Sequence, residues 1–437
     1  MKLYSKKILI NLLIFIPITT GLAQSLKTDS LSLNDAIKLT LTNQPLIQQA
    51  VEQVNAVSAR VKEQNSSYYP IVEGNLSYAW IGPVISLAFP GMGNFDFNTP
   101  NNYDMHVSAG YTLYDFGRRD AELDLIKSYK LSAEEKINLV KSNLAYSTIQ
   151  TFYSILFLEK SIAVKEDQIN TLNQHLELTK KKVASGSATD FDALTTEVRV
   201  SSAENDKTDI ENALAKEEIY LKSLLGYSAD QPLNLSGDFS TSGQNISLDS
   251  LVTQAFNMRP EIKLAKDAEN SAKLTKQVSA LGDRPTLSLD ASYGLKNGFF
   301  PDLDVLRGNW AAAISAIIPI FNGNRTDYKV EEAEANLKES TQEILSLERN
   351  IKAQVQSAYS DWETNKEKLD RTKIQVKQAE DALSRAELQY RDGVITNLDL
   401  IDSETSLAEA RLLYLQIIYK NVLSKYALDK VAGEVVW

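Results

Sequence analysis

Cysteine is absent from the 437-residue chain, which excludes disulfides, thiolate zinc sites and cysteine nucleophiles. Histidine occurs only twice, at His106 and His175, and this argues against a histidine-rich metal site or a Ser–His catalytic pair. Acidic residues outnumber basic ones, 57 to 46, and the net charge of −11 disfavours nucleic acid as a partner. Glycine and proline are sparse, which favours long uninterrupted helices. We expect no catalytic centre and no cofactor.

The first 23 residues have the pattern of a secretion signal. Lys2, Lys6 and Lys7 precede an apolar run over 8–20, and small residues follow at the positions that direct cleavage. A membrane anchor is the alternative, but spanning a bilayer takes about 20 residues. We expect 1–23 to be removed. No later segment has about 18 consecutive apolar residues, so the exported protein is expected to lack a transmembrane helix.

The remaining chain shows an internal repeat. Matching positions are 215 residues apart in the first part of each copy and 207 apart in the second. The change of offset corresponds to two connecting segments of unequal length, 83–102 and 296–307. Chance similarity between helical patterns is the alternative, but the register is kept through proline, glycine and tyrosine positions. Matching pairs include Pro45 and Pro260, Pro70 and Pro285, Gly186 and Gly393, Thr189 and Thr396, and Asp192 and Asp399.

This repeat predicts the domain organisation. The first copy covers 24–230 and the second covers 246–437, joined by a polar linker over 231–245 that is rich in Ser, Gly and Asn. Each copy is expected to contain two short helices, two strands, one very long helix, a break at a glycine and a last helix.

The long helices suggest a coiled coil. The segment 117–184 would extend about 100 Å at 1.5 Å per residue, too long for a compact globule. Apolar residues recur every seven positions in its distal part and at the matching positions of the second copy, which predicts left-handed supercoiling. An ordinary amphipathic helix is the alternative. The two series are Ile162, Ile169, Leu176 and Val183, and Leu369, Val376, Leu383 and Tyr390.

Four segments alternate between apolar and polar residues, as β-strands do. They cover about 71–82, 103–115, 286–296 and 308–321, lengths that suit tilted strands of an outer-membrane barrel. A soluble β-sandwich shows the same alternation, but the signal peptide and the long helices favour the membrane. Aromatic residues gather near the strand ends, as in an interfacial girdle. They are Tyr69, Trp80, Tyr103, Tyr114, Trp310 and Phe321.

Four strands do not close a barrel, and lipid does not tolerate unpaired strand edges. Oligomerisation is therefore expected, and three protomers would supply twelve strands. The segments 83–102 and 296–307 are expected to be irregular extracellular loops, because the first contains several prolines and glycines.

The order and spacing of these features resemble the TolC family of outer-membrane efflux and secretion channels. The resemblance rests on the repeat, on the segments YDFGRR at 114–119 and FNGNR at 321–325, and on the helix turns at 186–192 and 393–402. It implies a mainly α-helical protein with a membrane β-barrel. A homotrimer would form a twelve-stranded barrel in outer-membrane lipid and an α-helical barrel across the periplasm. Its implied partners are a periplasmic adaptor and an inner-membrane transporter.

The resemblance also implies roles for individual residues. Asp399 and Asp402 fall on the carboxylates that ring the periplasmic constriction, where crowded charges favour cations and raise one another's pKa. However, Thr396-x-x-Asp399 and Thr189-x-x-Asp192 also have the spacing of helix capping boxes. Asp399 therefore has two candidate roles, whereas Asp402 lies too far inside its helix to cap it.

Tyr390, Asp192 and Thr189 fall in the region that ties the inner hairpin to its neighbour in the closed state of the family. Tyr390 is equally a heptad core position. Ile395 departs from the family, in which an arginine can contribute to these closed-state contacts. His175 is expected on a helix surface and His106 facing the barrel lumen by alternation.

The function implied is a passive exit duct for small molecules or proteins. A periplasmic adaptor is the alternative, although it would show one helical hairpin and no lipid-facing strands. A secreted enzyme is a third possibility, but no nucleophile–base or metal constellation supports it.

Overall fold

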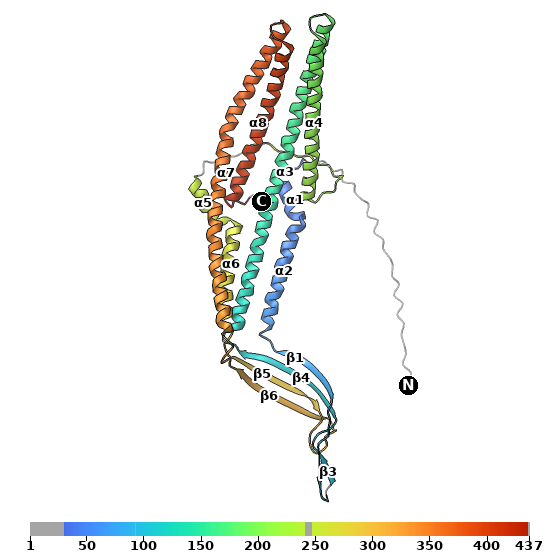
Figure 1. Ribbon diagram of the computed structural model, residues 1–437, viewed down its shortest axis with the longest axis vertical. Helices are drawn as coiled ribbons and strands as arrows, with labels where there is room; N and C mark the ends of the chain where they lie inside the picture. Colours follow the sequence, from blue (N-terminus) through green and yellow to red (C-terminus); the bar gives the residue numbers. More distant parts are fainter. Residues whose placement is uncertain (1–29, 92, 241–246, 436–437) are drawn as a thin grey trace, which may run out of the picture.

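The computed structural model describes residues 30–91, 93–240 and 247–435. The expected signal peptide, 1–23, and the last part of the expected linker lie outside these residues. The molecule is elongated, with a four-stranded sheet at one end and two helical hairpins at the other (Figure 1). The mainly helical fold with a few strands agrees with the prediction.

Two helices of 67 residues each, α3 and α7, run the length of the helical part. On the side of the sheet, α2 packs on α3, and α6 packs on both long helices. On the opposite side, α4 pairs with α3 and α8 pairs with α7, forming the two hairpins (Figure 1). The helix bounds are α1 (Leu33–Asn43), α2 (Pro45–Ser66), α3 (Arg118–Ala184), α4 (Asp190–Leu225), α5 (Leu248–Met258), α6 (Pro260–Ala280), α7 (Arg325–Arg391) and α8 (Asn397–Val431).

Proline begins α2 and α6, at the first helical position, where its missing N–H costs no hydrogen bond. Among the helices of the described ranges, none combines the length and apolar character that a membrane-spanning helix needs.

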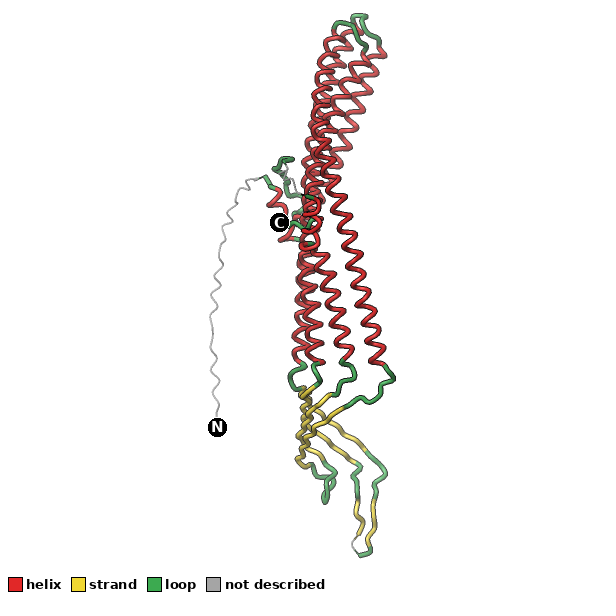
Figure 2. The backbone as a smooth tube through the Cα atoms, turned by 90° about the vertical axis from the view of Figure 1, so that its left-hand side faces the viewer, coloured by secondary structure: helices red, strands yellow, loops and turns green. Residues whose placement is uncertain are grey.

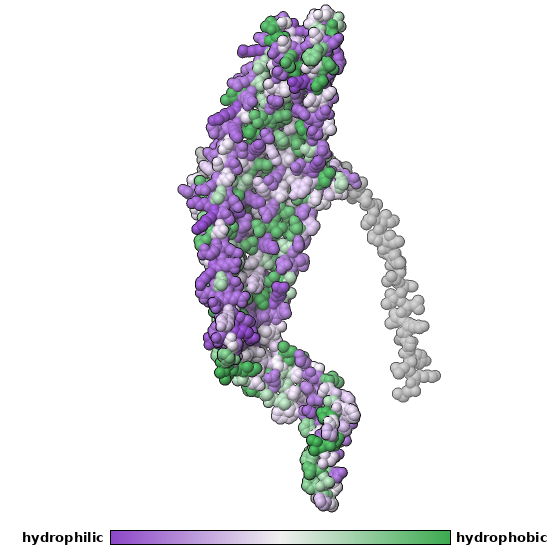
Figure 3. All heavy atoms as spheres, in the orientation of Figure 1, coloured by the Kyte–Doolittle hydropathy of each residue, from purple (hydrophilic) through white to green (hydrophobic). Residues whose placement is uncertain are grey.

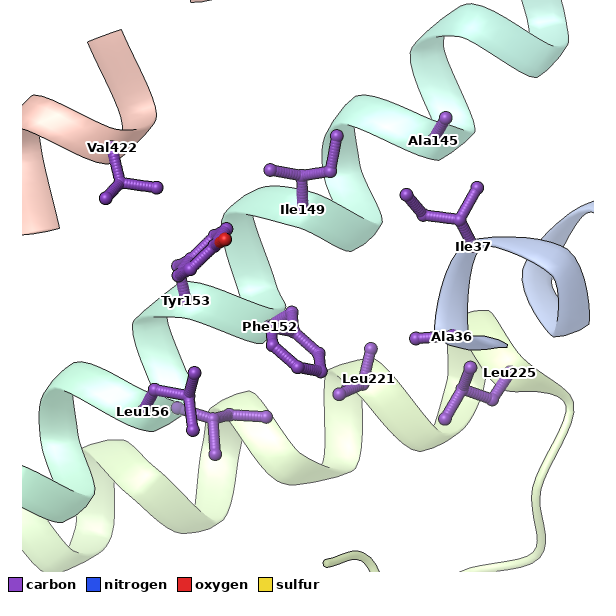
Figure 4. Packing of buried hydrophobic residues seen from close by; sticks show 11 residues of the cluster. Ala36, Ile37, Ala145, Ile149, Phe152, Tyr153, Leu156, Leu221, Leu225 and Val422 are labelled. Carbon is purple, nitrogen blue, oxygen red and sulfur yellow. The ribbon is translucent and has the colours of Figure 1, made fainter. Parts of the chain in front are cut away.

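The largest apolar core lies at mid-length, where α1, α3, α4 and α8 meet. Ile149, Phe152 and Leu221 are fully buried there and pack together (Figure 4). Burying large side chains of this kind stabilises a fold by about 1.5–3 kcal/mol each. This core therefore connects the two hairpins to the part of the molecule that carries the sheet.

The first part of the expected linker packs on this core. Leu31 pairs with Leu235 in an isolated parallel bridge, and the Leu31 N–H donates to the Asn234 carbonyl at 2.8 Å. Leu233 and Phe239 lie against the buried cluster. The irregular backbone of this segment agrees with the expected polar loop, but the packing of its apolar side chains on the core was not expected.

The sheet has the order β1-β4-β5-β6 (Figure 1), and all its pairs are antiparallel. Figure 2 shows the strands at the end of the long helices, joined to them by short loops. Alternation along each strand places the large apolar side chains on one face and His106, Ser108, Asp290 and Ser292 on the other. The strand bounds are β1 (Ile71–Trp80), β4 (Asn101–Tyr114), β5 (Thr286–Lys296) and β6 (Arg307–Ile317).

Two details differ from the sequence prediction. The last strand ends at Ile317 and not at 321, because Pro319 has no N–H to continue the ladder. The expected irregular loop over 83–102 contains a small hairpin, formed by β2 (Ser86–Phe89) and β3 (Gly93–Asp96).

Gly294 lies against the backbone of β4, opposite His106. A Cβ atom built on it would lie 2.1 Å from the Met105 carbonyl oxygen and 2.5 Å from the His106 Cα, so the backbone would have to shift. We expect Gly294→Ala to disturb the β4/β5 register and lower the yield of protein inserted in membranes. Gly74→Ala in β1 is the control, because nothing lies within 4 Å of that position. Equal yields for the two variants in a membrane fraction would contradict the expectation.

Candidate functional site at the hairpin tips

Each hairpin turns at a glycine and restarts at a capping box. Gly186 and Gly393 have φ of +74° and +73°, a conformation that glycine adopts without strain. At the start of α8, the Thr396 N–H donates to Asp399 Oδ2 at 2.8 Å, and the Asp399 N–H donates to Thr396 Oγ1 at 3.2 Å. The Thr189–Asp192 pair does the same for α4. Both capping boxes expected from the spacing are confirmed.

These hydrogen bonds keep the capping carboxylates ionised. Donation from the Thr396 hydroxyl and backbone N–H holds the pKa of Asp399 below its usual range. The backbone N–H and hydroxyl of Thr189 have the same effect on the pKa of Asp192. The crowding of charges expected in a trimer would act on Asp399 in the opposite direction.

Asp402 follows Asp399 by three residues and is also exposed, so the two carboxylates are neighbours on the helix surface. The nearest cation to Asp402 is Arg199 of α4, whose Nη2 lies 3.9 Å from its Oδ1. This pair crosses between the two hairpins. Nothing in the spacing of the chain relates Arg199 to Asp402, so the sequence does not predict this pair.

A buried polar cluster joins the hairpins just inside their tips. It consists of His175 and Thr179 from α3, Thr196 from α4, and Tyr390, Asn397 and Glu404 from α7 and α8. We call these six residues the inter-hairpin cluster. Buried polar groups of this kind are costly unless each finds a hydrogen-bond partner.

Asn397 is at the centre of the inter-hairpin cluster. Its Oδ1 accepts from His175 Nε2 at 2.9 Å and from the hydroxyls of Thr179 and Tyr390 at 3.3 Å each. Its Nδ2 donates to the Asp192 carbonyl at 3.2 Å and to Thr196 Oγ1 at 3.3 Å. The first residue of α8 therefore bonds to both helices of the other hairpin.

His175 is only 4% exposed, so the prediction that it lies on a helix surface is wrong. Its Nδ1 lies 3.2 Å from Glu404 Oε2, and its Nε2 faces Asn397 Oδ1. Both neighbours are acceptors, so each ring nitrogen faces a group that can accept from an N–H. His106, by contrast, lies on the polar face of the sheet, with its Nδ1 2.8 Å from Asp104 Oδ1.

Tyr390 is a core residue of its hairpin, as its heptad position predicts, and it also faces the other hairpin. It is buried in the apolar cluster between α7 and α8, and its hydroxyl lies 3.3 Å from Thr179 Oγ1 in the other hairpin. Lys182 of α3 donates to the Tyr390 carbonyl at 2.8 Å, and its ammonium lies 3.7 Å from the centre of the ring. Such an arrangement adds a cation–π attraction to the hydrogen bond.

The structure does not bring all the expected residues into the inter-hairpin cluster. The Asp192 carboxylate bonds to Thr189, and only its backbone carbonyl reaches Asn397. Thr189 caps α4 and stays exposed. The sequence does not predict the roles of Asn397 and Glu404, because their partner His175 in the other hairpin is more than 200 residues away.

The tips also carry exposed apolar side chains. Phe191 and Leu194 of α4 are exposed, as are Val394 in the second turn and Leu398 at the start of α8. In the described part of the chain, no three histidine, aspartate or glutamate residues lie close enough to hold a metal ion.

Comparison with known proteins gives consistent matches over nearly the whole chain. The outer membrane efflux protein family matches residues 36–227 and 251–434. The cation efflux system protein CusC of Escherichia coli is 22% identical, covering 91% of this chain and 85% of that protein. The alkaline protease secretion protein AprF of Pseudomonas aeruginosa is also 22% identical, with coverages of 93% and 88%. A crystal structure of CusC superimposes with a TM-score of 0.80 at 20% identity, covering 92% of each chain.

Proposed function

Because the chain belongs to the outer membrane efflux protein family, we propose that it is the exit duct of a tripartite efflux or secretion system. It resides in the outer membrane and extends into the periplasm. The duct is passive: it carries out no catalysis, and the inner-membrane transporter supplies the energy. Its relatives include a cation efflux protein and a protease secretion protein, so the proposal covers small molecules and proteins as cargo.

The observation that carries this proposal is the sheet joined to the long helices. One face of the four strands is apolar and exposed, with Leu76, Trp80, Tyr293, Trp310 and Ile314 among its side chains. Lipid requires every strand edge to be paired. We propose that three copies close a twelve-stranded barrel. Because each chain contains an internal repeat, the ring of strands and helices would be nearly regular.

In this trimer Asp399 and Asp402 would surround the periplasmic opening. The inter-hairpin cluster, with Tyr390 among its members, would hold the hairpins in the closed state, and Asp192 and Thr189 would shape the adjacent turn. The exposed apolar side chains at the tips fit contact with a periplasmic adaptor, because apolar patches on a soluble surface mark interaction sites. The segments that join β1 to β4 and β5 to β6 would be extracellular.

Electrophoresis of an outer-membrane fraction tests the proposal. We expect a band at the mass of a trimer without heating and a monomer band after heating, and mass measurement in detergent should give three copies. A stable monomer or dimer, or recovery in the soluble periplasmic fraction, would contradict the proposed function.

A further inference from the structure

The β2–β3 hairpin at the far end of the molecule is strongly amphipathic. In its antiparallel register Leu87 pairs with Phe95 and Ser86 with Asp96, and the Phe97 N–H extends the ladder to the Ile85 carbonyl. Side chains two residues apart share a face of a strand. One face therefore carries only large apolar side chains and the other is mostly polar. The hairpin apolar face consists of Ile85, Leu87, Phe89, Phe95 and Phe97.

This face is not covered within the chain. Its five side chains are between 41% and 61% exposed, and Figure 3 shows hydrophobic residues over this end of the molecule. The nearest other segment is the connection between β5 and β6, where the Phe97 and Phe300 rings lie 6.1 Å apart. Residues 300–305 of the same chain line a cleft of about 820 Å³ together with Ser86, Asn94 and Asp96, so this connection lies mostly beside the polar face of the hairpin. An isolated two-stranded hairpin is marginally stable in water, so this face needs a partner.

The order of the strands says which partner can reach it. In the described sheet, β1 and β6 each have a single neighbouring strand, so barrel closure pairs β1 of one copy with β6 of the next. The directions alternate along the sheet, which makes this pairing antiparallel. The Trp80 end of β1 then lies beside the Arg307 end of the neighbouring β6. The hairpin follows Trp80, and the residues just before Arg307 belong to the β5–β6 connection.

That connection exposes apolar side chains of its own. Phe299, Val305 and Leu306 are each at least 40% exposed in the single chain. Two exposed apolar surfaces would thus lie side by side, on different copies, at the end of the barrel farthest from the helices. Burying such surfaces against each other is favourable by roughly 25 cal/mol per Å² of apolar area.

We propose that the hairpin apolar face packs against residues 299–306 of the neighbouring copy. The occupant of this surface is a second copy of the same chain, and the contact covers the outer end of the seam at which β1 and β6 of different chains meet. The inference rests on the proposed trimeric duct. It adds an interaction surface outside the barrel strands that holds adjacent copies together.

Disulfide formation between copies tests this contact directly, since the chain has no cysteine of its own. Leu87→Cys and Leu306→Cys are placed in separate chains with different affinity tags and expressed together. After mild oxidation, we expect one disulfide-linked species that carries both tags. Ser86→Cys with Leu306→Cys is the matched control, because Ser86 lies on the opposite face. It should give about tenfold less product, since a disulfide needs Cβ atoms within about 4.5 Å.

A spin label attached at Leu87→Cys separates protein contact from the other environments. We expect low accessibility both to oxygen, which concentrates in lipid, and to a water-soluble nickel complex. High oxygen accessibility would make lipid the occupant and overturn the inference, as would high accessibility to the nickel complex. A disulfide between two Leu87→Cys chains would place the hairpins against one another and also overturn it.

Failure of this contact and failure of the proposed function give different results. A heat-modifiable trimer without the disulfide that joins the two tags overturns the inference and leaves the proposed duct intact. Loss of the trimer in the unmodified chain overturns both.

Discussion

Replacing Asn397 with alanine should release the two helical hairpins from each other and leave the channel open for a larger fraction of the time. The substitution removes the acceptor for His175, Thr179 and Tyr390, and the donor to the Asp192 carbonyl. These groups are buried, so those that lose their partner are unsatisfied while the hairpins remain together. When the hairpins separate, water can take the place of the missing amide.

The expected size of the effect follows from the cost of unsatisfied groups. Each buried donor or acceptor that loses its partner costs about 1–3 kcal/mol. A net loss of about 2–3 kcal/mol from the closed state changes the closed-to-open ratio roughly 30- to 150-fold. Single-channel recordings in planar bilayers should show a longer open time. Cells carrying the variant should become sensitive to large antibiotics that the outer membrane normally excludes.

Asp190→Ala is the matched control for this variant. Asp190 is the first residue of α4, as Asn397 is of α8, and it stands 207 residues earlier in the chain. It is exposed, so its replacement should leave the open time unchanged. If Asn397→Ala lowers the thermal stability but conducts like the unmodified channel, then the inter-hairpin cluster only stabilises the fold and has no part in closing the channel.

The local features of the hairpins could be predicted from the sequence. Gly186 and Gly393 interrupt long helical patterns, and a threonine followed three residues later by an aspartate marks each restart. These signals act over a few residues, and the structure places the turns and the capping boxes there. The alternation of the strands similarly predicted which side chains share a face of the sheet.

The inter-hairpin cluster could not be predicted in the same way. His175 and Glu404 are separated by 229 residues, and periodicity within one helix does not say which polar residue of another helix it will meet. A single histidine among the polar residues of one helix therefore predicts an exposed side chain. In the structure His175 is buried, because residues of the other hairpin pack against it. The pairing of Arg199 with Asp402 was missed for the same reason.

The far end of the molecule shows another limit of the sequence pattern. The segment 83–102 contains prolines and glycines, which favour turns, yet a short apolar–polar alternation on either side of Gly91 forms β2 and β3. Four residues in each strand are too few to be distinguished from a loop by alternation alone.

Replacing both Asp399 and Asp402 with asparagine should weaken the preference of the channel for cations. Both carboxylates are exposed near the start of α8, and three-fold repetition around a narrow axis would turn them into a concentrated negative field. Bilayer recordings under a salt gradient should show a reversal potential closer to zero, and multivalent cations should block the double variant less. The fold should survive, since an asparagine at 399 can still accept from the Thr396 N–H.

The hydrogen bonds that lower the pKa of Asp399 give this prediction a pH dependence. A carboxyl whose pKa is held down in the folded protein stays ionised at its usual pKa and loses its charge only as the pH falls further. The stability that its hydrogen bonds contribute is present above the unfolded pKa and is lost as the pH falls through the folded pKa. Asp402→Asn removes half of the carboxylates that would crowd Asp399 and raise its pKa. In this single variant the remaining cation preference should therefore persist at and somewhat below the usual pKa of an aspartate.

Replacing Arg199 should strengthen the negative field of Asp399 and Asp402, the opposite effect to removing the carboxylates. Its guanidinium lies 3.9 Å from Asp402 and partly offsets that carboxylate, so Arg199→Gln should raise the cation preference. Both side chains are well exposed, so the pair itself contributes little to stability, about 0–1 kcal/mol. The effect on selectivity should therefore appear without a measurable change in unfolding temperature.

Asp192→Asn is the matched control for the carboxylate variants. Asp192 occupies the same position in the capping box of α4 that Asp399 occupies in α8, so the two substitutions disturb equivalent hydrogen bonds. Its carboxylate is assigned to the turn of the other hairpin and should leave selectivity nearly unchanged. If the double variant of Asp399 and Asp402 keeps its selectivity, or if Asp192→Asn reduces it equally, then these carboxylates serve only their helix and do not line the pore.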